Sequence, residues 1–88
     1  MTPEDVAEWM LAAITKDGCL YQDDVVDYLV RAEADDLLRE NSDGNLVIGT
    51  KVLTAFKTLT PENVVWVRPD FYWRFRVPED EPGRDARG

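Results

Sequence analysis

The chain has 88 residues, which is enough for one hydrophobic core and too few for two. Apolar residues make up 44% of it, with three Trp, three Tyr and three Phe, so the composition excludes a fully disordered chain. A single cysteine and the absence of histidine exclude an intrachain disulfide and imidazole chemistry. No apolar run reaches the roughly 18 residues of a membrane span, so we expect a cytoplasmic protein without a membrane partner.

The net charge of −8 disfavours nucleic acid as a partner, because affinity for phosphate comes mainly from Lys and Arg. The charge is unevenly distributed along the chain. Residues 21–45 contain eight acidic and two basic side chains, whereas residues 46–77 contain five basic and two acidic ones. We therefore expect a basic surface over residues 46–77 on an otherwise acidic protein.

The first predicted element is a helix that begins after Thr2 and ends before Gly18. Thr2 can cap it with Pro3 at its first position, and Gly18 suits the left-handed position that follows a helix. Its apolar side chains recur at helical spacing and form one stripe: Val6, Trp9, Met10, Ala13 and Ile14.

A short edge strand, residues 19–21, is expected next, followed by a second helix that opens at residues 22–24 and ends near Ala32 or Ala34. The following stretch has two interpretations. Leu37 and Leu38 can continue the helix, or residues 37–41 and 45–48 can pair around Asp43-Gly44, a strong hairpin signal. We favour the hairpin. The apolar face of the second helix is Val25, Val26, Leu29 and Val30.

A third helix is predicted to begin at Gly49-Thr50 and to end at Thr60-Pro61. Its helical spacing divides it into two faces. The inward face is Val52, Leu53, Phe56 and Leu59, and the outward face is Lys51, Thr54, Lys57 and Thr58.

Two strands, residues 64–67 and 71–77, are predicted to form a hairpin around the turn Arg68-Pro69-Asp70. The second strand alternates, with Phe71, Trp73, Phe75 and Val77 expected in the core and Tyr72, Arg74 and Arg76 in solvent. We expect one domain over residues 1–77 and a disordered acidic tail over residues 78–88.

This order of elements resembles a winged helix. The predicted fold class is α+β, with three helices, a C-terminal β-hairpin and an additional small hairpin between helices 2 and 3. In DNA-binding winged helices the third helix enters the major groove and the wing contacts the backbone. The resemblance implies those roles for Lys51, Thr54, Lys57 and Thr58 and for Arg68, Arg74 and Arg76, although the helix presents no Asn, Gln or Arg to read bases.

A second resemblance is to a small bacterial family of uncharacterised proteins. It rests on residues 2–10, on the Asp43-Gly44-Asn45-Leu46 turn and on Val64-Val65-Trp66. It implies no activity.

Two acidic patterns resemble metal sites but lack what those sites need. Residues 23–27 match the DDxxD pattern of helical isoprenoid synthases, yet this chain is too short to enclose their cavity, so we interpret the aspartates as stabilising a helix N-terminus. Residues 41–44 resemble part of a calcium loop, but Arg39 and Thr50 stand where its terminal ligands belong. Cys19 is interpreted as a small buried hydrophobe. No metal or cofactor is expected.

We predict a non-catalytic interaction module that binds a protein partner or a second copy of itself. Its surface would comprise Tyr72, Arg74 and Arg76, with Lys51, Lys57 and Arg68. One alternative is a nucleic-acid-binding transcriptional regulator that uses helix 3 and the wing, and another is a metal-dependent carboxylate enzyme. The arginines can also simply pair with acidic groups of the same molecule.

Overall fold

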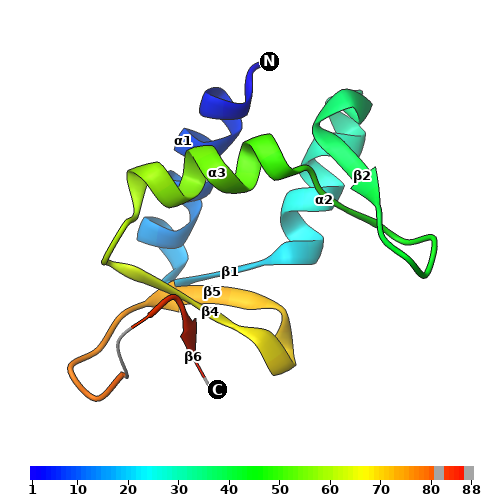
Figure 1. Cartoon of the computed structure of the whole chain (residues 1–88). Coiled ribbons are helices and arrows are strands. Elements are labelled where there is room, and N and C mark those ends of the chain that lie inside the picture. Colours follow the sequence, from blue (N-terminus) through cyan, green and yellow to red (C-terminus); the bar gives the residue numbers. More distant parts are fainter. Residues whose placement is uncertain (81–82, 87–88) are drawn as a thin grey trace.

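Three helices pack over one face of a β-sheet, and a separate small hairpin lies beside the second helix (Figure 1). The computed structural model describes residues 1–80 and 83–86. The predicted α+β class, with three helices and a C-terminal hairpin, is confirmed. The elements are α1 (Pro3–Asp17), β1 (Cys19–Tyr21), α2 (Gln22–Arg31), η1 (Asp35–Leu37), β2 (Leu38–Glu40), β3 (Leu46–Ile48), α3 (Thr50–Leu59), β4 (Val64–Val67), η2 (Arg68–Asp70), β5 (Tyr72–Phe75) and β6 (Asp85–Ala86).

The ends of α1 are set by local hydrogen bonds that the sequence predicts. The Asp5 N–H donates to Thr2 Oγ1 at 3.1 Å, and the Thr2 N–H donates to Asp5 Oδ2 at 3.0 Å, which completes a capping box. At the other end Gly18 has φ 81°, and its N–H donates to the carbonyl of Ile14. No helix in the described part of the chain is long and apolar enough to cross a membrane.

The core lies where α1 crosses α3 above the sheet. Met10 and Phe56 are fully buried in it, and Trp73 of β5 is 4% exposed. Outside this centre, Trp9 stacks on Tyr28 with ring centroids 3.9 Å apart and joins α1 to α2. The other fully buried side chains of the helices are Val6, Ala7, Ile14, Val25, Leu29 and Val52.

The main sheet has the strand order β1-β5-β4-β6. β5 pairs antiparallel with both β1 and β4, so Leu20, Trp73 and Trp66 lie side by side on the face that meets the helices. The predicted edge strand at residues 19–21 is therefore confirmed. Cys19 is only partly buried within it.

The stretch between α2 and α3 forms the predicted hairpin rather than a longer helix. β2 and β3 pair antiparallel, and Asn41 closes the turn because its Oδ1 accepts the N–H groups of Asp43 and Asn45. Gly44 has φ 81°, a left-handed conformation that glycine adopts without steric cost.

The period-two interpretation of residues 71–77 is correct in placing Trp73 in the core and Tyr72 on the opposite face, but it fails at the other odd-numbered positions. Phe71 is 57% exposed, Phe75 37% and Val77 43%, so the prediction that all three lie in the core was wrong. The physical reason is that β5 spans only residues 72–75 and that α3 covers its inner face at the middle, where Phe56 meets Trp73. The predicted inward positions of Val30 and Leu59 were also wrong, because these side chains are 45% and 40% exposed.

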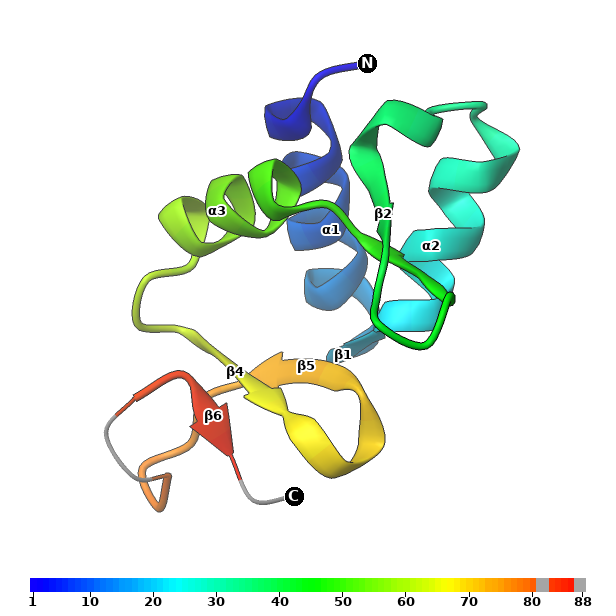
Figure 2. The same cartoon turned by 45° about the vertical axis from the view of Figure 1, so that its right-hand side comes forward.

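Part of the segment assigned to a disordered tail is paired in the structure. β6 runs parallel to β4, and the Trp66 N–H donates to the carbonyl of Arg84 at 2.6 Å (Figure 2). The predictions for residues 81–82 and 87–88 lie outside the described residues. The domain boundary at residue 77 stays a prediction.

Gly49 is a position at which even one methyl group should disturb the fold. A Cβ there would lie 2.6 Å from the backbone oxygen of Leu37, although the backbone φ of −64° suits any residue. We expect Gly49→Ala to lower the free energy of unfolding by about 1–3 kcal/mol, the usual cost of overpacking, as measured by urea denaturation. Ser42→Ala, in the exposed β2–β3 turn, is the control and should be neutral; equal stability of the two variants would contradict this packing.

Candidate interaction surface

A row of aromatic rings runs from the core to the surface along the inner face of the sheet. Phe56 is fully buried and contacts Trp73 edge-on, with centroids 5.5 Å apart. Trp73 contacts Trp66 at 4.6 Å, and Trp66 contacts Phe71 edge-on at 6.1 Å. The row thus ends in an exposed ring that the rigid core supports.

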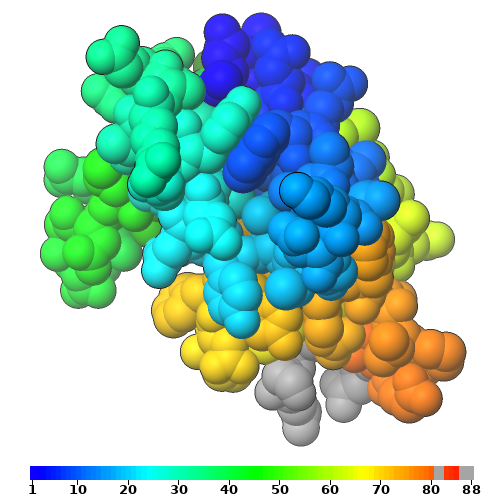
Figure 3. Space-filling model, turned by 180° about the vertical axis from the view of Figure 1, so that it is seen from behind, coloured from blue at the N-terminus to red at the C-terminus, as the bar shows by residue number. Residues whose placement is uncertain are grey.

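The backbone holds Phe71 in this exposed position. Phe71 follows the η2 turn with φ 55° and ψ 48°, the left-handed region that costs a residue with a side chain about 1–3 kcal/mol. Its N–H donates to the Arg68 carbonyl, and its carbonyl accepts from the Gln22 N–H at 3.0 Å. The turn is therefore tied to the start of α2, and the two segments lie together in Figure 3 (yellow and cyan).

The opposite face of the sheet carries rings at the same end. Tyr21 and Tyr72 are cross-strand neighbours with centroids 5.1 Å apart, and Tyr21 is 47% exposed. Rings on both faces therefore surround the end of the sheet where β4 turns into β5. We call the set Tyr21, Trp66, Phe71 and Tyr72 the aromatic end.

The charged groups beside the aromatic end are mainly acidic. Asp70 directly precedes Phe71, and Asp23 and Asp24 occupy the first turn of α2 next to Tyr21; all three are exposed. The two cations nearest in the sequence are Arg68 and Arg74, and each pairs with a carboxylate of the chain, Arg68 with Asp85 and Arg74 with Asp80, both at 2.8 Å. The aromatic end thus combines exposed rings with negative charge.

The two arginines predicted to project from β5 and its extension contact their own chain. Arg74 makes two hydrogen bonds to the Asp80 carboxylate, at 2.8 and 2.9 Å, and the two side chains are 23% and 11% exposed. Arg76 donates to the carbonyl oxygens of Glu62 and Gly83. The Arg74 hydrogen bond, with help from the Val77 N–H, lowers the pKa of Asp80 to about 2 and raises the pKa of Arg74.

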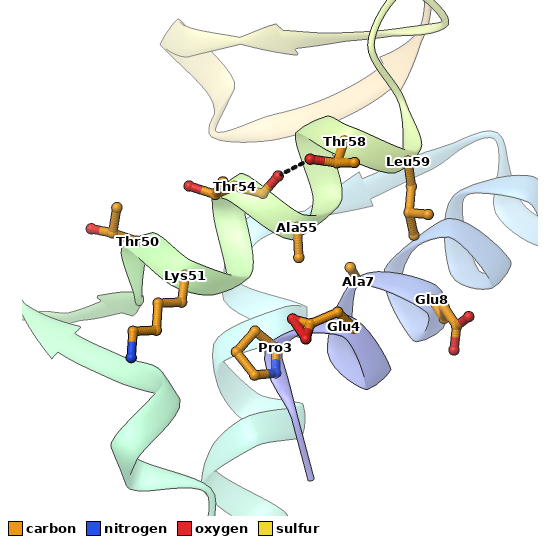
Figure 4. A pocket seen from close by; sticks show the side chains of 10 residues that line it. All are labelled: Pro3, Glu4, Ala7, Glu8, Thr50, Lys51, Thr54, Ala55, Thr58 and Leu59. Carbon is orange, nitrogen blue, oxygen red and sulfur yellow. Dashed lines mark hydrogen bonds between the residues drawn. The ribbon is translucent and has the colours of Figure 1, made fainter.

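The basic residues predicted for the third helix lie in two different hollows. Lys51 lines a groove of about 760 Å³ between α1 and α3, where Ala7 and Ala55 face each other and Glu4 lies on the opposite wall (Figure 4). Lys57 lines a second hollow of about 630 Å³ together with Arg76 and Arg84. Of the six residues predicted for partner binding, the structure brings Lys57 and Arg76 together in one hollow and places Lys51 in the other. The remaining three line neither hollow: Arg68, Tyr72 and Arg74.

Sequence reasoning missed three residues that shape these surfaces. Asp80 and Arg84 come from a polar segment whose composition shows nothing of their partners, so no local signal identifies them. Phe71 was assigned to the core because it continues the alternation of the strand. The Pro69-Asp70 pair that precedes it was the available signal, since a strand begins only after its turn has closed.

The aspartates of residues 23–27 form no metal cluster with neighbouring groups. Among the described residues, no set of three or more His, Cys, Asp or Glu side chains could hold a metal ion.

A family model described as a family of unknown function (DUF6953) matches residues 2–75. No curated protein and no solved structure matches the chain.

The Arg74–Asp80 pair should make stability depend on acid pH. Because folding lowers the pKa of Asp80 from 3.8 to about 2, the stabilisation is complete above pH 3.8 and disappears as the pH falls toward about 2. We expect Asp80→Asn to lower the thermal midpoint at neutral pH and to match the wild type near pH 2. Asp85→Asn, which breaks a pair of exposed side chains, is the control and should change little. A constant deficit of Asp80→Asn across this range would show that the carboxylate charge is not responsible.

Proposed function

The chain belongs to DUF6953, and we propose that it is a small non-catalytic module that binds another protein through its aromatic end. The segment it recognises would combine apolar side chains with Lys or Arg. The observation that carries this proposal is the 57% exposed ring of Phe71, held outward by a strained backbone and supported from below by Trp66.

Aromatic residues of this kind are common anchors in protein interfaces, because they bury a large area and lose little side-chain entropy. An exposed phenylalanine on a supported row of rings can bury its face without reorganising the domain. The backbone of Phe71 is strained because its φ is positive. Strained residues cluster at binding sites, where the conformation serves contact with a partner and not stability.

The charge of the aromatic end favours a basic partner. Asp23, Asp24 and Asp70 can pair with cations at its rim, and an exposed ring attracts Lys or Arg by a cation–π contact of about 0.5–1 kcal/mol. The net charge of −8 would speed the approach of such a partner at low salt. A second copy of the chain is one candidate, because α3 carries two lysines and no acidic residue.

Two phenylalanines at opposite ends of β5 allow a matched test. We expect Phe71→Ala to weaken binding of a short peptide that alternates arginine and leucine by about tenfold or more, because it removes the central anchor. Phe75→Ala, with a ring 37% exposed at the far end of the strand, should bind as the wild type does. Chemical shift changes in a nitrogen-15 NMR titration measure both the affinity and the location.

The same titration with glutamate in place of arginine is the charge control and should show no binding. Equal loss in Phe71→Ala and Phe75→Ala, or shift changes that avoid the aromatic end, would contradict the proposal. Sedimentation of the wild type and of Phe71→Ala at low and high salt tests the self-association version. A monomer at both salt concentrations would remove it.

A second candidate function is nucleic-acid binding through α3, because this helix carries the exposed Lys51 and Lys57 and has no acidic residue. It predicts that random duplex DNA binds at about 50 mM salt and that changing both lysines to Ala abolishes this binding. The Phe71→Ala variant is the matched control, and it should bind DNA normally. No mobility shift at that salt concentration would exclude this function.

A further inference from the structure

The outer side of β4 is paired only through a very short strand. β5 covers one side of β4 along all of Val64–Val67, whereas β6 covers the other side with two residues. The Trp66 N–H donates across this second side to the Arg84 carbonyl. Without residues 83–86, β4 would be an open edge, which is the kind of strand that pairs with extended peptides.

The Arg84 side chain enters a socket beside this edge. Its guanidinium donates to the Thr60 carbonyl at 2.5 Å, to Thr60 Oγ1 at 3.1 Å and more weakly to the Val64 carbonyl at 3.4 Å. It also lies 5.6 Å from the centroid of the Phe56 ring. Thr60 and Phe56 are 1% and 0% exposed, so the socket walls belong to the core.

The chemistry of the socket suits an arginine. Carbonyl and hydroxyl oxygens match the planar fork of N–H donors of a guanidinium, and a ring face accepts its flat surface. Within the described residues no carboxylate pairs with Arg84, so recognition comes from shape and hydrogen bonds. Arg84 is only partly buried, so its side chain can leave the socket without the core being opened.

Apart from the Arg84 side chain in the socket and the Arg76 hydrogen bond to the Gly83 carbonyl, residues 83–86 are held mainly by two exposed interactions. The strand pairing involves two residues, and the Arg68–Asp85 ion pair joins side chains that are 71% and 57% exposed, a kind of pair that stabilises little. The residues matched by the family model include the socket but not the arginine that occupies it. Residues 2–75 include Phe56, Thr60 and all of β4, but not Arg84.

We propose that the outer side of β4, together with the Thr60–Phe56 socket, is a docking site for an extended peptide that carries an arginine followed by an acidic residue. The chain's own Arg84-Asp85 occupies this site in the absence of such a peptide. The arginine enters the socket, the next residue pairs with Arg68, and the peptide backbone extends the sheet. This site uses the backbone edge of β4 and the socket, whereas the proposed binding at the aromatic end uses exposed rings. The Trp66 N–H belongs to the first site and the Trp66 ring to the second.

The test uses the full chain with its own occupant weakened. We expect a fluorescent peptide with the sequence of residues 78–88 to bind the Arg84→Ala chain, because the socket is then empty. The wild-type chain should bind it at least about tenfold more weakly, since a tethered segment competes at high effective concentration. Peptides with Ala or Lys at the arginine position are the matched controls and should bind weakly or not at all, with fluorescence anisotropy as the measurement.

Two results would overturn the proposal. One is an Arg84→Ala chain that is folded by circular dichroism and does not prefer the arginine peptide over its alanine control. The other concerns hydrogen exchange in the wild type. We expect the Trp66 amide to exchange faster than the β4 amides bonded to β5, because β6 opens on its own. Equal protection would show that β6 opens only when the whole protein unfolds, and this measurement decides the matter if Arg84→Ala does not fold.

Phe71→Ala separates this site from the aromatic end. Introduced into the Arg84→Ala chain, it should leave the affinity for the arginine peptide unchanged while weakening the arginine–leucine peptide. Parallel loss of both affinities would show that there is one surface instead of two and would overturn the independent edge site.

Discussion

The protein depends on the contact between Trp73 and Phe56, which joins the sheet to the helices. Trp73 lies in the middle of β5, between Leu20 of β1 and Trp66 of β4, and is 4% exposed. Truncating a buried ring of this size typically costs about 3–5 kcal/mol, a large part of the stability of a small domain. Because β5 links β1 to β4, placing this one side chain orients three strands beneath the helices.

The same contact decides which rings are left exposed. α3 covers the centre of the sheet and not its ends, so Phe71 and Phe75 emerge on either side of the buried Trp73. Only the Phe71 end has further rings on both faces and acidic residues around it. Because the sheet is short, one apolar stripe supplies both a buried ring at its centre and exposed rings at its ends.

The basic excess of residues 46–77 is largely used within the molecule. Arg74 pairs with Asp80, Arg68 pairs with Asp85, and Arg76 bonds to backbone carbonyls. Acidic residues that follow β5 therefore neutralise Arg68 and Arg74. Only the two lysines of α3 remain as exposed cations of that stretch without an ion pair in the described structure. The acidic character of the remaining surface follows, and it is the basis for expecting a basic partner.

Local interactions made much of the fold predictable from the sequence. The Thr2–Asp5 capping box, the left-handed Gly18 and the Asp43-Gly44 turn each involve residues within a few positions of one another, so the sequence determined where these elements begin and end. Tertiary structure alone decided the outward turn of Phe71, the Arg74–Asp80 pair and the insertion of Arg84 beside Thr60. The alternation of β5 specifies two faces, but which positions are covered depends on how far α3 reaches across the sheet. The partners of the arginines depend on where the polar C-terminal segment packs against the sheet. The composition of that segment carries no information about its position.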